Sequence, residues 1–234
     1  MLRTAWLLVL FLPALQAAAQ GSPCGCDDVR DLRNRICEAR AAIAEYDRQI
    51  GRIQNFERDV LKKPLLASGD IYEQCMQPCI QEAINSVSDP GARKSTAETD
   101  ETCEIVFKTP PATSCLRESL LRHERFHQTE CMARLQAIQD SSLFGPFLSL
   151  FKSVRTGQSL VSLATEEKIA YRGEIEHNLA ELRRLSANCP RAMFEVERNG
   201  RREFTIDYCP PPRPRPEPSA CPARCPLAMQ QVGR

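Results

Sequence analysis

The longest pattern of apolar and polar positions lies between residues 29 and 60. Apolar side chains recur at alternating spacings of three and four residues, with charged residues between them: Val29, Leu32, Ile36, Ala39, Ile43, Tyr46, Ile50, Ile53 and Val60. This heptad-like repeat predicts one long amphipathic helix, capped by Asp27 or Asp28 and ended by Lys62-Lys63-Pro64. We interpret it as a helix packed on its own domain. The alternative is a coiled coil through which the helix binds a partner.

Weaker patterns predict four further elements. We expect helices over about 70–87, 115–139 and 165–186, and a strand at 104–108, where Ile105-Val106-Phe107 is β-branched and aromatic. The polar run 88–101 is typical of a loop, and residues 143–164 show no clear pattern. Residues 193–208 predict a β-hairpin, because Asn199-Gly200 is the sequence that two-residue hairpin turns favour.

These elements predict a mainly α fold with a small β component, an α+β class. We divide the chain into an N-terminal helical region at 20–101, a central region at 102–190, the hairpin at 189–209 and a Pro-rich tail at 210–234. The Pro-x-Pro repeats of the tail predict extended polyproline without a core.

The first nineteen residues are typical of a secretory signal. Arg3 precedes a short apolar run, and Ala17-Ala18-Ala19 offers small residues for cleavage near Ala19. No later segment is long and apolar enough to cross a membrane. Twelve cysteines in such a chain predict disulfides rather than cysteine-metal sites. We therefore expect a secreted or periplasmic protein.

Spacing suggests partners for some of the cysteines. Cys189 and Cys209 flank the hairpin, and we predict that they are bridged. Cys131 is expected to pair with Cys115, with Cys103 or with the N-terminal helices. Further expectations are that Cys75 and Cys79 clamp a neighbouring element, with Cys24, Cys26 and Cys37 as candidate partners, and that Cys221 and Cys225 staple the tail.

Charge excludes one class of partner. Lys and Arg number 31 against 30 Asp and Glu, and no basic patch with interleaved aromatic residues occurs. We therefore expect no nucleic acid partner.

The candidate chemistry lies in the helix expected at 115–139. His123-Glu124-Arg125-Phe126-His127 holds two of the chain's three histidines at helical spacing. Residues four apart share one helix face, so both imidazoles can bind one zinc ion while Glu124 acts as a base. The helical wheel places these side chains in the apolar stripe with Leu116, Leu120, Cys131, Leu135 and Ile138. A buried carboxylate and two buried imidazoles favour a metal, which would satisfy all three.

A catalytic zinc needs a third protein ligand. Positions 130 and 133 are Glu and Ala, so a third histidine does not follow directly. In the helix at 165–186, Glu167 borders the apolar stripe and is our first choice. Glu174 is the alternative.

The region 103–190 resembles the zincin superfamily of metallopeptidases, in its branch with a glutamate third ligand. The likeness rests on His123-Glu124-x-x-His127, a strand before that helix, and Glu167-x-x-Ala170 on a later helix. It implies a zincin-like core, His123 and His127 as zinc ligands, and a peptide or protein substrate that pairs with an edge strand at Ile105. It also implies that Glu124 activates a zinc-bound water. Tyr171 is a candidate oxyanion helper, with a purely structural role as the alternative.

Two other functions fit parts of the sequence. Glu124-x-x-His127 and Glu174-x-x-His177 are paired as in ferritin-like di-iron bundles, but residues 143–165 lack the intervening Glu which that fold needs. The second is a non-catalytic, disulfide-rich exported interaction or structural protein, in which the motif is degenerate or binds a structural metal.

Overall fold

The computed structural model describes residues 23–66, 72, 76–140 and 158–213. Its described part is mostly helical, with two small antiparallel hairpins, as the α+β prediction requires. The expected signal segment, Cys75, Cys221, Cys225 and nearly all of the Pro-rich tail lie outside the described residues.

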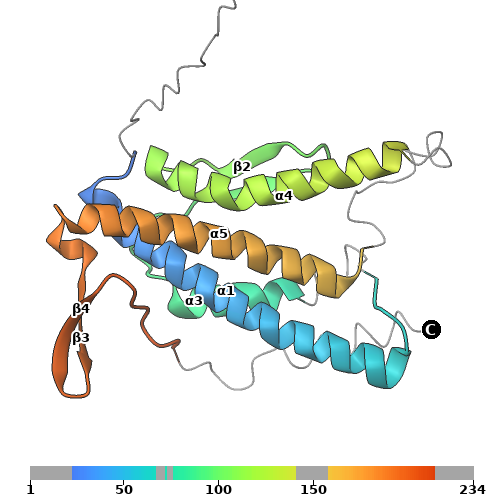
Figure 1. The fold of residues 1–234 in the computed structure, drawn as a ribbon, viewed down its shortest axis with the longest axis horizontal. Helices are drawn as coiled ribbons and strands as arrows, with labels where there is room; N and C mark the ends of the chain where they lie inside the picture. Colours follow the sequence, from blue (N-terminus) through green and yellow to red (C-terminus); the bar gives the residue numbers. More distant parts are fainter. Residues whose placement is uncertain (1–22, 67–71, 73–75, 141–157, 214–234) are drawn as a thin grey trace, which may run out of the picture.

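Three long helices form the body of the molecule (Figure 1). They are α1 (Val29–Phe56), α4 (Ser114–Asp140) and α5 (Leu160–Ser186). α5 lies between α1 and α4, and the shorter helix α3 (Gln77–Val87) packs on α1. Helix α1 therefore packs against both α5 and α3, and α5 packs against both α1 and α4.

The predicted stripe of α1 is buried over most of its length, because it packs against both α5 and α3. At its end the chain continues as a π-helical segment, Glu57–Leu61, which stops at Lys62 in the left-handed conformation. Val60 was expected in the stripe but is 62 % exposed, since the wider turn rotates it away from the core. Asp28 does not cap α1: its carboxylate accepts a hydrogen bond from the main chain of Gly25.

Two apolar clusters fill the interior at opposite ends of the α1–α5 pair. One gathers Tyr46, Ile53, Met76, Ile80 and Leu160, and the other gathers Leu32, Ile36, Leu182 and Leu185 beside two disulfides. The interface between them is polar, with Glu174, Asn178 and Glu45 fully or almost fully buried.

The first hairpin pairs β1 (Thr96–Thr99) with β2 (Ile105–Thr109) and lies against α4. β2 matches the expected strand, but β1 falls in a run expected to be a loop. Alanine, threonine and glutamate give β1 no apolar alternation, and its pairing with β2 and packing on α4 decide its conformation.

The second hairpin confirms the turn prediction. β3 (Phe194–Arg198) pairs with β4 (Arg201–Thr205), with Arg198 opposite Arg201. Asn199 and Gly200 both have positive φ, 54° and 73°, as a type I′ turn requires.

Four disulfides join distant parts of the described chain. They are Cys24–Cys115, Cys26–Cys189, Cys37–Cys209 and Cys103–Cys131. The predicted Cys189–Cys209 bridge is wrong, because the hairpin's two flanks each bond to the start of the chain instead. Cys24, Cys26 and Cys37 are therefore not partners of Cys75 or Cys79. For Cys131, the pairing with Cys103 is one of those expected.

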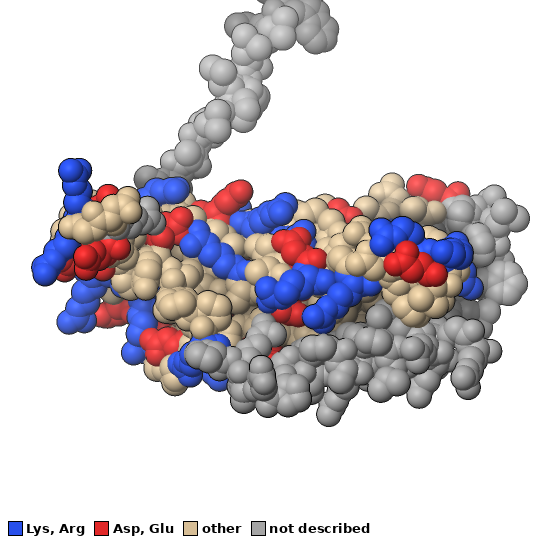
Figure 2. Space-filling model, turned by 90° about the horizontal axis from the view of Figure 1, so that it is seen from below, with Lys and Arg blue, Asp and Glu red and all other residues tan. Residues whose placement is uncertain are grey.

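Charges of both signs are interspersed over the face seen in Figure 2. Neither acidic nor basic side chains form a continuous region there, in line with the balanced composition. No helix in the described ranges is long and apolar enough to cross a membrane.

Candidate metal centre

Helix α4 directs the motif inward. His123, Glu124 and His127 are all buried, together with Leu116, Leu120 and Cys131 of the same predicted stripe. Leu135 of that stripe is half-buried, and the side chain of Ile138 lies outside the described residues. The histidines face α5, and Glu124 faces β1. Three polar side chains of α4 are thus held in the interior, where they meet polar residues of α5 and β1.

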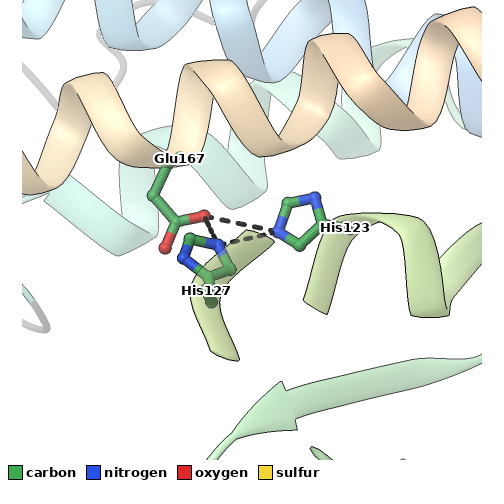
Figure 3. Close-up of side chains that lie close together, drawn as sticks. All are labelled: His123, His127 and Glu167. Atoms are coloured by element: carbon green, nitrogen blue, oxygen red, sulfur yellow. Dashed lines mark hydrogen bonds and ion pairs between the residues drawn. The ribbon is translucent and has the colours of Figure 1, made fainter. Parts of the chain in front are cut away.

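Glu167 of α5 completes a triangle with the two histidines (Figure 3). The Nε2 atoms of His123 and His127 are 3.2 Å apart, and they lie 3.5 and 3.4 Å from Oε2 of Glu167. Ligands ~2.0–2.2 Å from a tetrahedral ion are separated by about 3.3–3.6 Å. The three atoms therefore have the spacing of three zinc ligands with the fourth position open.

This triad is the one group of three such side chains, among the residues that the structure describes, that could hold a metal ion. Glu174, the alternative third ligand, approaches the other nitrogen of His123: its Oε2 is 3.5 Å from Nδ1. It is therefore placed behind the histidine and not beside the open position. A carboxylate at this place orients a ligating imidazole and selects its tautomer.

Arg35 of α1 holds Glu174 in turn. Its Nε and Nη2 both lie 2.6 Å from Oε1 of Glu174, and the Ser119 hydroxyl contacts the same oxygen at 3.3 Å. Glu174 has an exposed fraction of 0 %, so this charge depends on Arg35 for compensation. The N-terminal helix, which the zincin resemblance does not cover, thus supports the candidate centre.

The site has an excess of negative charge that favours a cation. Burial would lower the pKa of His123, but the nearby carboxylates of Glu167 and Glu174 outweigh it and raise the pKa to about 10. Burial would raise the pKa of Glu174, but the charge of Arg35 and the proximity of His123 hold it at about 2. The pKa of Glu167 is likewise held far below its usual range, against burial, by the charges and hydrogen bonds of His127 and His123.

Thr99 of β1 fixes the candidate base. Its hydroxyl lies 3.0 Å from Oε2 of Glu124 and 3.1 Å from the main-chain oxygen of the same residue. Strand β1 therefore reaches the motif helix at Glu124, and the strand beside the site is β1 rather than the Ile105 strand that the resemblance implied.

Three tyrosines surround the triad on the side of α1. The ring of Tyr171 packs edge-on against His123, with centroids 4.5 Å apart. Burial, and then the charge of Glu167, raise the pKa of Tyr171 well above its usual value, so its hydroxyl keeps its proton. Tyr46 and Tyr72 share a 2.7 Å hydrogen bond between their hydroxyls and line the same cavity.

A cavity of about 440 Å³ opens onto the triad. Its floor holds His123, Glu124, His127, Glu167 and Tyr171, and its walls come from β1 with residues 93–95 and from α3. This volume lies within the range of ligand-binding clefts.

Two disulfides anchor the helix that carries the motif. Cys24–Cys115 fixes its first turn to the start of the described chain. Cys103–Cys131 ties the turn between β1 and β2 to α4 one helical turn beyond His127. Gln128 adds a hydrogen bond to the main-chain oxygen of Cys103 at 2.9 Å.

The second Glu-x-x-His pair does not join the cluster. Glu174 approaches His123, but Nε2 of His177 is buried without a hydrogen-bond partner in the described part of the chain. Burial, and then the charge of Arg122, lower the pKa of His177. A di-iron site needs both pairs to meet, and here His177 lies outside the cluster of His123, His127 and Glu167.

Arg35 and Thr99 are the residues of this site that sequence reasoning missed. A charged residue between apolar positions of a helix is typical of a solvent-facing surface, and Thr99 lies in a run typical of a loop. Contacts between distant segments bring both to the site.

No protein-family model, curated protein or solved structure matches this chain.

Proposed function

We propose that the protein is an exported, zinc-dependent metallopeptidase of the zincin type. The observation that carries the proposal is the triangle of His123, His127 and Glu167, with edges of 3.2–3.5 Å, beside a buried glutamate in an open cavity. A lone motif on a helix surface would not bring a third carboxylate from another helix to that distance. Export is supported by the signal-like first nineteen residues and by the disulfides.

Each residue near the centre has a chemical role in this proposal. His123, His127 and Glu167 hold the ion, and Glu174 with Arg35 orients His123. A bound zinc ion supplies a Lewis acid that polarises the scissile carbonyl and lowers the pKa of a water molecule.

Glu124 is the general base. It accepts the proton of the attacking water and transfers it to the leaving amine, so its carboxylate must stay near the reacting atoms through both steps. Thr99 restrains that carboxylate at 3.0 Å. Tyr171 is the candidate donor to the oxyanion, because its hydroxyl is protonated and it lines the cavity.

Purified, oxidised protein tests the proposal. We expect one zinc per chain and peptide hydrolysis that a chelator abolishes. The Glu124→Gln variant should retain zinc and lose at least ~100-fold in kcat, the usual contribution of a general base. Glu130→Gln, on the same helix but outside the cavity lining, is the matched control and should cleave normally.

The alternative is a non-catalytic exported interaction or structural protein. The observation in its favour is the disulfide set, which joins both ends of the described chain into one rigid unit. Zinc-loaded wild type that hydrolyses no member of a broad peptide library would favour this function over the peptidase.

A further inference from the structure

The cavity extends from the metal centre as a groove with two walls that run in opposite directions. Along α1, Met76 at the N-cap of α3 packs in the same apolar cluster as Tyr46, and Ser88 at the C-cap of α3 donates a hydrogen bond to Glu38. The segment before β1 starts near Asp31, whose carboxylate accepts a hydrogen bond from the main-chain N–H of Arg93 and lies 3.9 Å from the Arg93 side chain, and β1 ends at Glu124. Strand β1 and helix α3 therefore face each other antiparallel across the groove.

The wall formed by α3 carries a row of side-chain amides. Gln77, Gln81 and Asn85 line the cavity, are exposed, and follow one another at four-residue spacing. Nε2 of Gln81 donates to Oδ1 of Asn85 at 3.0 Å, so two members of the row are already aligned. Each amide offers both a donor and an acceptor, and none carries charge.

The spacing of this row matches that of an extended peptide. Four residues of helix rise ~6 Å, so the three amides recur at that interval along α3. Peptide groups that point to the same side of a strand recur every two residues, or ~6.6 Å. Successive amides can therefore meet successive N–H and C=O pairs along one edge of a peptide.

The volume and one unpaired group agree with such an occupant. With a strand cross-section of ~4.8 by ~10 Å and a rise of ~3.3 Å per residue, the 440 Å³ cavity encloses about three residues of extended chain. Ser95 lines the opposite wall with an exposed fraction of 5 %, and its hydroxyl has no hydrogen-bond partner in the described ranges. A buried hydroxyl without a partner costs free energy that a ligand's polar group would recover.

We propose that the amide row of α3 binds the main chain of an extended polypeptide from the side opposite β1. This deepens the proposed function, on which it rests for the identity of the reaction. It assigns the substrate class as unfolded or extended segments, which are selected by backbone conformation rather than by particular side chains. Folded helices are excluded, because their main-chain groups are already paired.

A binding assay tests the amide row without requiring cleavage. The Glu124→Gln protein is titrated into two fluorescein-labelled, unstructured hexapeptides of different side-chain composition, and anisotropy gives Kd. Replacing Gln81 and Asn85 by Leu in that background should weaken both peptides about equally, by roughly 5- to 20-fold. Gln54→Leu on the exposed face of α1 is the matched control and should leave Kd unchanged.

Methylation of the peptide's main-chain nitrogens separates backbone recognition from side-chain recognition. Methyl groups at alternate positions that face α3 should remove the difference between the parent and the double variant. Equal binding of the unmethylated peptides by parent and double variant, a loss confined to one of the two peptides, or a difference that persists with the methylated peptides would overturn the amide-row proposal. Absence of hydrolysis by the wild type would overturn the peptidase proposal alone, because the binding assay does not depend on it.

Discussion

Arg35 and Glu174, which are 139 residues apart in the chain, meet at 2.6 Å behind His123. Glu174 of α5 contacts the candidate ligand His123 of α4, and Arg35 of α1 in turn holds Glu174. The contact also explains why the N-terminal helix and the central region form one body: the polar network that orients His123 is shared between them.

Removing the Arg35 guanidinium should weaken the metal centre without touching a ligand. In Arg35→Met, Glu174 remains buried without its counter-charge, and we expect zinc affinity to fall about 10- to 100-fold, as for other outer partners of ligating histidines. Unfolding free energy should fall by about 3–5 kcal/mol, the cost of breaking one side of a buried ion pair. Competition with a chromophoric chelator gives the affinity, and urea titration gives the stability.

Arg35→Lys and Arg52→Met complete that experiment. Lysine keeps the charge but not the two-nitrogen contact, so the zinc affinity and stability of Arg35→Lys should lie between those of the wild type and Arg35→Met. Arg52 is an exposed residue of the same helix, and its variant should match the wild type. A normal zinc affinity in folded Arg35→Met would show that Glu174 orients His123 without help from α1.

Substitutions of the two glutamates of α5 should separate a ligand from its support. Glu167→Gln removes one of the three candidate ligands, and we expect a loss of more than ~100-fold in zinc affinity with loss of hydrolysis. Glu174→Gln should lose about 10- to 100-fold in affinity and keep hydrolysis at saturating zinc. The reverse order of the two affinities would assign Glu174 as the ligand and Glu167 as the support.

Metal-free protein should lose stability as the pH rises. The pKa of His123 is raised from 6.5 to about 10 in the folded protein, so its contribution is fully present below pH 6.5 and is lost as the pH rises towards 10. Glu174 has the opposite sign: its pKa is lowered from 4.5 to about 2, so its contribution is present above 4.5 and is lost as the pH falls towards 2. Thermal unfolding of the chelator-treated protein between pH 6.5 and 10 measures the first effect.

Two comparisons identify His123 as the cause of the loss of stability between pH 6.5 and 10. Saturation with zinc should remove this dependence of stability on pH, because the metal replaces the proton on the imidazole. His123→Gln should also remove it. His177→Gln should retain it, since the pKa of His177 is lowered and its titration lies below this range.

Loss of the Cys103–Cys131 bridge should affect catalysis more than metal binding. The bridge closes a sequence separation of 28 residues, and its removal in the double Ser variant should cost about 3 kcal/mol of stability. Its loss frees the turn that follows Thr99, so the restraint on Glu124 loosens while the triad between α4 and α5 stays in place. We expect a several-fold lower kcat at unchanged zinc stoichiometry. A loss of bound zinc equal to the loss of kcat would indicate that the bridge supports the triad itself.

Local patterns in the amino-acid sequence were sufficient to predict most helices, one hairpin and the residue types at the site. Periodicity predicted α1, α4 and α5 closely, because each buries a stripe that recurs at helical spacing. Asn199-Gly200 predicted its hairpin, because both residues tolerate the positive φ that the turn requires. His123 and His127 are four residues apart, so their common face followed from helix geometry alone.

Which side chains meet the two histidines depends on how the helices pack against each other. The choice between Glu167 and Glu174 depends on how α5 is rotated against α4, and both glutamates border the same stripe. Strand β1, the partners of Cys189 and Cys209, and the contact of Arg35 with Glu174 all join segments far apart in the chain. Spacing along a sequence specifies which residues are neighbours on one helix or strand. The pairing of helices and strands depends instead on how their complementary faces pack. The residues that support the candidate metal centre, Glu174, Arg35 and Thr99, are brought to it by this packing.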